Sequence, residues 1–246
     1  LIADYLGVKA IFLLIAALAL LAVPAVLLLV PTPSKTGTED SGLSLNRLLS
    51  VLRDTTLWRL HTGIFTTNAT LRGLFVVTPF FLESTLGTDR EWLVSLSVLV
   101  VSGIVMFPTI FLAEREGLIP ETLLASVGLL SIGLMVFLLG SPGLTGLLVA
   151  LTFYFVGFSL LEAILPSLVT RVAGESDRGT AMGVFNMSQY LGAFAGSVYG
   201  GFFLKTTGSG TVPIAVPWMF GGLVLLVAAW TIFGRDLTST DATLAR

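Results

Sequence analysis

Residues 144–172 decide the fold, and they read LTGLLVALTFYFVGFSLLEAILPSLVTRV. A helix needs about 20 mostly apolar residues to cross the hydrocarbon core of a bilayer, and this stretch is long enough. Its apolar run is continuous rather than alternating, which favours a transmembrane helix over a barrel strand. A single acidic residue, Glu162, lies within it.

Further stretches of the same character lie on both sides of this segment. They predict an all-α polytopic membrane protein with about seven spans. The other predicted spans are residues 10–30, 57–82, 92–112, 121–139, 180–204 and 213–233.

The composition supports a lipid environment and excludes several classes of protein. Hydrophobic residues make up 54% of the chain and charged residues only 11%, whereas a soluble domain carries roughly 25% charged residues. A formal net charge of -2 argues against a nucleic-acid-binding protein. With no cysteine and a single histidine, His61, we predict no metal site and no cofactor.

The first residues, Leu-Ile-Ala-Asp, include no initiator Met and no signal peptide. We therefore expect the chain to be a fragment of a longer protein.

The connection at residues 31–56 is long and polar at its start. Its later part has leucines at helical spacing, flanked by Arg47 and Arg53, which predicts an amphipathic helix in the membrane interface. An early start of the second span explains the pattern equally well. The leucines are Leu45, Leu48, Leu49 and Leu52.

Basic residues predict the orientation, because cytoplasmic connections carry an excess of Lys and Arg. Alternate connections place nine of the 13 basic residues on one side, which we predict to be cytoplasmic together with the C-terminal tail, residues 235–246. These nine are Lys35, Arg47, Arg53, Arg59, Arg115, Arg171, Arg178, Arg235 and Arg246. The opposite side holds Lys9, Arg90 and Lys205, and Arg72 lies inside a span.

Two charged residues lie near the middle of predicted spans, Arg72 and Glu162. A central charge costs about 2.5–3.5 kcal/mol on insertion scales, so each is expected to face protein or a wet cavity. Similar predicted depths lead to the hypothesis that they interact in a shared cavity. A buried ion pair that only fixes helix packing, or an outward-snorkelling Arg72, would explain the same pattern.

Polar and aromatic neighbours extend these faces as candidate substrate- or proton-binding residues. Asn68 lies one turn before Arg72, Tyr154 and Phe158 precede Glu162 at spacing four, and the sixth predicted span carries Asn186, Gln189 and Tyr190. Amides also join transmembrane helices, so packing and ligand binding stay open for Asn186 and Gln189.

Gly192, Gly196 and Gly200 recur every fourth residue, which predicts a face for close helix packing rather than a phosphate loop. Residues 157–160, Gly-Phe-Ser-Leu, lack the second glycine of a nucleophile elbow. We therefore predict no enzyme activity and no catalytic residue.

Several segments resemble the major facilitator superfamily. Residues 4–12, Asp-Tyr-Leu-Gly-Val-Lys-Ala-Ile-Phe, resemble the entry to its sixth helix, and residues 113–117, Ala-Glu-Arg-Glu-Gly, resemble the second copy of its cytoplasmic loop motif. That copy is degenerate, because Ile110 replaces the first glycine and Leu118-Ile119 replace the basic pair. Residues 161–168 and the segment at 178–183 are similar to the tenth helix, its loop and the eleventh helix of drug-efflux-type, YajR-like bacterial permeases.

The resemblance implies a twelve-helix fold of two pseudosymmetric halves that works by alternating access. Residues 1–30 would end the N-terminal half, residues 31–56 would form the central cytoplasmic loop, and residues 57–234 would form the six-helix C-terminal half. It places Arg72 and Glu162 at the central cavity. Its loop residues here are Glu114, Arg115, Gly117, Arg178 and Gly179.

The resemblance further implies a permease of the bacterial inner membrane, coupled to protons, that moves a small organic solute, with efflux favoured. Its partners would be that solute, protons, the lipid bilayer and the missing N-terminal half. An uptake symporter, or a scaffold or sensor without flux, are the alternatives.

Overall fold

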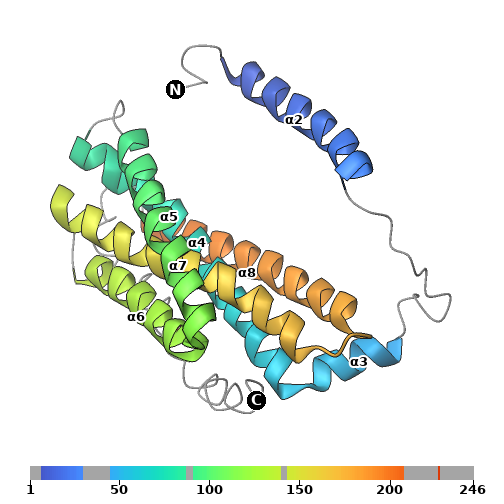
Figure 1. The fold of residues 1–246 in the computed structure, drawn as a ribbon. Coiled ribbons are helices and arrows are strands. Elements are labelled where there is room, and N and C mark those ends of the chain that lie inside the picture. Colours follow the sequence, from blue (N-terminus) through green and yellow to red (C-terminus); the bar gives the residue numbers. More distant parts are fainter. Residues whose placement is uncertain (1–6, 30–44, 87–90, 140–142, 208–226, 228–246) are drawn as a thin grey trace. The chain divides into compact units, whose positions relative to one another are not determined.

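The structure is a computed structural model that describes residues 7–29, 45–86, 91–139, 143–207 and 227 (Figure 1). The elements described in these ranges are all α-helices, as predicted. They are α2 (Val8–Leu29), α3 (Leu45–Arg53), α4 (Thr55–Leu86), α5 (Glu91–Glu116), α6 (Ile119–Leu138), α7 (Leu144–Val172) and α8 (Arg178–Thr207).

Six predicted spans correspond to α2 and α4–α8, and α4 and α5 extend beyond the prediction at both ends. By length and composition, the described residues contain three helices able to cross a membrane: Trp92–Glu116, Ile119–Phe137 and Leu144–Val172. The seventh predicted span, residues 213–233, lies outside the described residues apart from Val227, as does the predicted tail at 235–246.

The chain divides into two compact units, Leu1–Ser44 and Leu45–Arg246. Within the first, α2 exposes apolar side chains such as Phe12, Leu20 and Leu27 around its surface. A helix that is apolar all round needs lipid or protein as its surroundings.

The amphipathic segment after residue 44 is a helix of its own, α3. It ends at Arg53, and the Asp54 carboxylate caps the next helix by accepting hydrogen bonds from the backbone N–H groups of Thr56 (2.8 Å) and Leu57 (3.0 Å). An N-terminal cap of this kind fixes where a helix begins. The alternative, an early start of the second span, is therefore wrong.

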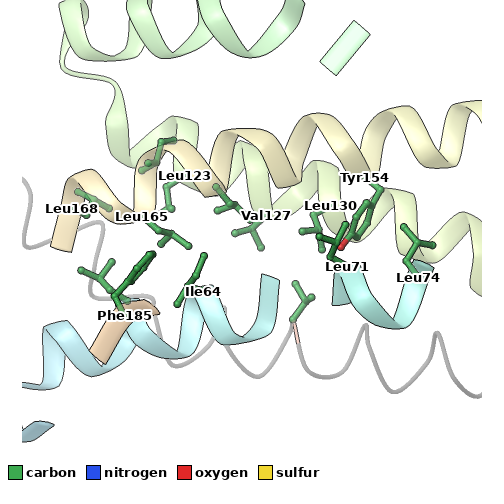
Figure 2. Packing of buried hydrophobic residues seen from close by; sticks show 14 of the residues in the cluster. Ile64, Leu71, Leu74, Leu123, Val127, Leu130, Tyr154, Leu165, Leu168 and Phe185 are labelled. Atoms are coloured by element: carbon green, nitrogen blue, oxygen red, sulfur yellow. The ribbon is translucent and has the colours of Figure 1, made fainter. Parts of the chain in front are cut away.

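Helix α7 is the centre of the second unit, because it packs against α4, α5, α6 and α8. Figure 2 shows side chains of neighbouring helices pointing toward one another in this core, among them Ile64 of α4, Val127 of α6, Leu165 of α7 and Phe185 of α8.

Helices α4 and α8 lie side by side (Figure 1) and approach closely at the glycines of α8. A Cβ at Gly192 would overlap the backbone of Phe65, and one at Gly196 would overlap the backbone of Ala69. Gly200 faces the side chain of Val76. The absence of side chains therefore sets the separation of this pair.

Helices α6 and α7 make the other close contact. A Cβ at Gly133 of α6 would come within 2.7 Å of the Ala150 carbonyl oxygen and of Tyr154, and one at Gly157 of α7 would come within 2.6 Å of the Leu130 nitrogen. The glycines here come from both helices.

Helix α5 carries much of the exposed apolar surface of the second unit. Its exposed side chains include Leu99, Ile104, Phe107 and Phe111. Such a continuous apolar surface on a long helix is typical of contact with lipid.

Candidate functional site

The centre of the candidate site is the carboxylate of Glu162 on α7. The Gln189 side chain of α8 donates from Nε2 to Glu162 Oε1 over 2.7 Å. Both residues are half-buried between their helices. An ionised carboxylate at this position is stabilised by an amide donor from the neighbouring helix.

Helix α4 supplies the third polar group, Asn68, whose side chain is buried and lies near the same carboxylate. Its Nδ2 also donates to the Ile64 carbonyl one turn earlier, over 3.3 Å. Three helices thus converge on Glu162, and two of their side chains are amides that can both donate and accept.

The remaining acceptor of the site is the other carboxylate oxygen, Glu162 Oε2. It is buried and has no hydrogen-bond partner among the described residues. In addition, Pro166 lies four residues later in α7 and has no N–H to give the Glu162 carbonyl. Glu162 Oε2 is therefore a buried acceptor without a donor among the described residues, which suits a group that takes up and releases a proton.

Aromatic residues adjoin the carboxylate along α7. Tyr154 is fully buried, and its hydroxyl shares a hydrogen bond with Thr70 Oγ1 of α4 at 3.0 Å. The Tyr154 and Phe158 rings are stacked with centroids 6.3 Å apart, and Phe155 lies 5.9 Å from Phe75 of α4. The two candidates Tyr154 and Phe158 thus belong to one aromatic cluster between α4 and α7.

Arg72 does not join this site. It is exposed on α4, and the described residues contain no ion pair between Arg72 and Glu162. Asn68 is close enough to the carboxylate to take the place that the sequence hypothesis gave to the arginine. Among the described residues the acid lies beside amides of α4 and α8, and its pairing with Arg72 stays a prediction.

The α8 candidates separate by direction. Gln189 turns toward α7 and meets Glu162, whereas Asn186 and Tyr190 are exposed. Gln189 and Tyr190 are adjacent in the sequence, and the rotation of about 100° between them gives their side chains different surroundings.

His61 lies on α4, buried at a tilted contact with the Phe185 ring of α8, whose centroid is 6.4 Å away. It is separate from the Glu162 site. The described residues contain no group of three or more His, Asp or Glu side chains that could hold a metal ion.

The predicted loop-motif residues gather at one end of the second unit. Arg171 at the end of α7 pairs with Glu114 at the end of α5 at 3.4 Å, and Arg178 Nε donates to the Thr170 carbonyl over 3.0 Å. Arg115 lies 3.7 Å from Glu116, its own neighbour in the chain.

Two glycines of the same motif lie in the turns at this end. Gly117 has φ of 71°, a left-handed conformation that ends α5 and that glycine adopts without strain. Gly179 is exposed in the first turn of α8.

The sequence reasoning overlooked Thr70, the partner of Tyr154. A signal was present, because Thr66, Thr67, Asn68 and Thr70 form a polar run inside an otherwise apolar span. All four are buried, and Thr67 returns its hydroxyl to the Gly63 carbonyl over 2.8 Å. Polar residues grouped at mid-span are themselves a pointer to an internal site.

The chain matches known proteins over most of its length. The sequence pattern of the Major Facilitator Superfamily matches residues 1–197 and, in a second alignment, residues 88–243. The inner membrane transport protein YajR of Escherichia coli (strain K12) is 30% identical over 198 residues, which cover 80% of this chain and 44% of that protein.

A protein described as the uncharacterized transporter BU466, of Buchnera aphidicola subsp. Acyrthosiphon pisum (strain APS), is 26% identical over 198 residues, 79% of this chain and 51% of that protein. The chain therefore spans about half the length of these curated relatives.

Proposed function

This chain belongs to the Major Facilitator Superfamily, and we propose on that basis that it is part of a proton-coupled secondary transporter for a small organic solute. In this proposal Glu162 carries the coupled proton, and the N-terminal half that pairs with this chain completes the transport path. Such proteins alternate the access of a central site between the two faces of the membrane.

The observation that carries the proposal is the surroundings of Glu162. Its Oε1 accepts from Gln189 at 2.7 Å, while Oε2 is buried without a partner among the described residues. An ionisable group inside a membrane bundle is costly and marks a functional site by default. Protonation would neutralise the acid and change which hydrogen bonds α7 makes with α8.

The solute is proposed to bind beside the aromatic cluster of α4 and α7. Phe155 and Phe158 are half-buried and stand one turn or two before Glu162 on α7. Flat apolar rings next to a carboxylate suit an amphipathic or cationic molecule. Outward transport, the direction we favour, rests on the resemblance to efflux permeases alone.

We further propose the bacterial inner membrane as the location, with the end of the bundle that holds Arg171 and Arg178 in the cytoplasm. Arg115 lies in the same end region, at the C-terminal turn of α5, next to the Glu114–Arg171 pair. A concentration of arginine at one end follows the positive-inside rule. The Escherichia coli relative is described as an inner membrane transport protein.

The test is Glu162→Gln in the full-length protein, reconstituted in proteoliposomes with a pH-sensitive dye inside. A panel of lipophilic organic cations, sugars and amino acids is applied to the unaltered protein to find solutes that move protons. Glutamine keeps the shape of the side chain and cannot release a proton, so the variant should lose the proton flux that these solutes evoke.

Glu175→Gln is the matched control, because Glu175 is an exposed acid in the turn between α7 and α8. It should leave the proton flux unchanged. Solute-evoked proton flux that survives in Glu162→Gln would remove this residue from the coupling role. The absence of any flux with the unaltered protein would favour the scaffold or sensor instead.

A further inference from the structure

Arg72 is an exposed charge near the middle of a predicted span, and neither the packing of the helices nor the proposed proton step uses it. Among the described residues its guanidinium has no ion-pair or hydrogen-bond partner. A charge within a span is costly in lipid and is expected to face protein or water. The direction in which Arg72 points therefore indicates what it can bind.

Two neighbours of Arg72 on α4 give this direction. Val76, four residues later, faces α8, because its side chain lies against Gly200. Phe75, three residues later, faces α7, where its ring centroid lies 5.9 Å from that of Phe155. With about 100° of rotation per residue, Arg72 lies about 40° from Val76 on one side and about 60° from Phe75 on the other. It therefore points between the directions of α7 and α8.

Asn68 lies one turn before Arg72 and on the same side of α4. At the level of Asn68 this side is covered, because the Glu162–Gln189 hydrogen bond of 2.7 Å joins α7 to α8 and the buried Asn68 lies near it. One turn is about 6 Å along the helix, and at that distance Arg72 is exposed. The arginine and the acid thus lie along one side of α4, with the arginine about a turn beyond the Glu162–Gln189 bond.

Aromatic rings border this side where α4 meets α7. Phe75 is 46% exposed, and Phe155 and Phe158 are half-buried. The Phe155 ring centroid lies 5.9 Å from that of Phe75 and 6.4 Å from that of Phe158. Phe158 precedes Glu162 by one turn. The three rings therefore connect the turn of Arg72 on α4 with the turn of Glu162 on α7.

We propose that Arg72 binds an acidic group of the transported solute, so that the solute is an organic acid with a flat apolar body. This inference rests on the proposed function, because it names the solute of that same transporter. A guanidinium binds a carboxylate, sulfonate or phosphate through paired, charge-assisted hydrogen bonds. Of the amphipathic and cationic solutes that the aromatic cluster suits, the arginine repels those that carry only a positive charge.

The test measures equilibrium binding to the full-length protein in detergent, at a single pH and without a gradient, so that it does not depend on proton coupling. The probes share one aromatic body and differ in charge. The acids are naphthoate, naphthalenesulfonate and naphthyl phosphate, the uncharged probe is naphthamide, and the cation is naphthylmethylamine. Titration calorimetry gives the affinities, and at least one acid should bind about tenfold tighter than the amide, as expected for one charge-assisted bond.

Arg72→Gln should weaken binding of that acid by about 10- to 100-fold, the range of a hydrogen bond to a charged group, and should leave the affinity for naphthamide within about twofold. Arg72→Lys keeps the charge without the fork of donors and should lose less. Arg53→Gln is the matched control, because Arg53 is exposed at the end of α3, and it should bind like the unaltered protein. Since Arg72 is exposed, all three variants should keep the unfolding temperature of the ligand-free protein.

Equal affinity of Arg72→Gln and the unaltered protein for the acids would overturn the proposal, and it would mean that Arg72 reaches toward lipid headgroups. Binding of only the amide or the amine would overturn it too, as would the absence of binding by every probe.

The proton-flux test of Glu162→Gln is separate from this one. Acid binding that depends on Arg72, together with proton flux that survives in Glu162→Gln, would refute the coupling role alone. The reverse pair of results would refute only the class of solute.

Discussion

Two helix pairs of the second unit approach each other through glycine, and they do so in different ways. In the α4–α8 pair three glycines at regular spacing on α8 face α4, which contributes backbone at Phe65 and Ala69 to two of them. In the α6–α7 pair each helix contributes one glycine, Gly133 and Gly157, and each receives the backbone of the other.

The difference shows in what each interface holds. The α4–α8 contact adjoins polar side chains: Gln189 of α8 bonds to Glu162, and Asn68 of α4 lies near the same acid. The α6–α7 contact lies among apolar residues such as Leu130, and its buried Ser126 hydroxyl bonds to its own helix at the Thr122 carbonyl over 2.6 Å. Close approach brings a site together in the first pair and fixes the packing in the second.

The largest effect is expected from Gly196→Leu in the α4–α8 pair. The new side chain would meet the backbone of Ala69, which has no rotamer to move aside. Overpacking destabilises by about 1–3 kcal/mol and occasionally more, and we expect the upper end of that range. Thermal unfolding in detergent, with size-exclusion chromatography of the surviving fraction, measures the loss.

Gly201→Leu is its control on the same helix. Gly201 is exposed with no neighbouring atom near its Cβ position, so leucine there should be neutral or should stabilise α8 by up to about 1 kcal/mol. Equal losses from the two variants would show that α8 does not use Gly196 for contact.

An intermediate effect is expected from Gly133→Ala in the α6–α7 pair. A methyl group would lie 2.7 Å from the Ala150 carbonyl oxygen, so the helices must separate, at a loss of about 1–2 kcal/mol in the unfolding free energy. Gly128→Ala on the same helix has open space and should gain about 0.5–1 kcal/mol. If Gly133→Ala and Gly128→Ala both raise the unfolding temperature, α6 and α7 do not make the close contact at Gly133.

The smallest effect is expected at the polar link between the pairs, Thr70 and Tyr154. Tyr154 packs beside Gly133 and shares its hydroxyl with Thr70 of α4. Thr70→Val and Tyr154→Phe should each reduce stability by about 0.6 kcal/mol, the average for interhelical hydrogen bonds in membranes. Because both substitutions remove the same hydrogen bond, the double variant should lose no more unfolding free energy than either single variant. Additive losses would mean that Thr70 and Tyr154 are not bonded to each other.

Much of this fold could be predicted, because apolar run length and helical spacing are visible in one sequence. The runs predicted α4–α8, and the leucine spacing predicted α3. The glycines of α8 stood out because they recur every fourth residue. Gly133 and Gly157 formed no pattern, since each needs only a single partner on the other helix.

The site was harder to predict because a sequence gives the depth of a residue along its helix but not the direction in which that helix turns its side chain. The rise of about 1.5 Å per residue gives the depth of Arg72 and Glu162, and it suggested that they meet. The rotation of a whole helix about its axis depends on its packing. Asn68 and Arg72 share a side of α4, yet the packing buries the amide and exposes the guanidinium.

The cap at Asp54 has a consequence for everything beyond it on α4. In a helix the first residue determines how far along the axis each later residue lies and in which direction around the axis its side chain points. Asn68 lies 13 residues beyond Thr55, about 20 Å along that axis. One residue inserted between the cap and Asn68 would turn Asn68 by about 100° and place Thr67 where the amide had been, although the helix would lengthen by only one residue.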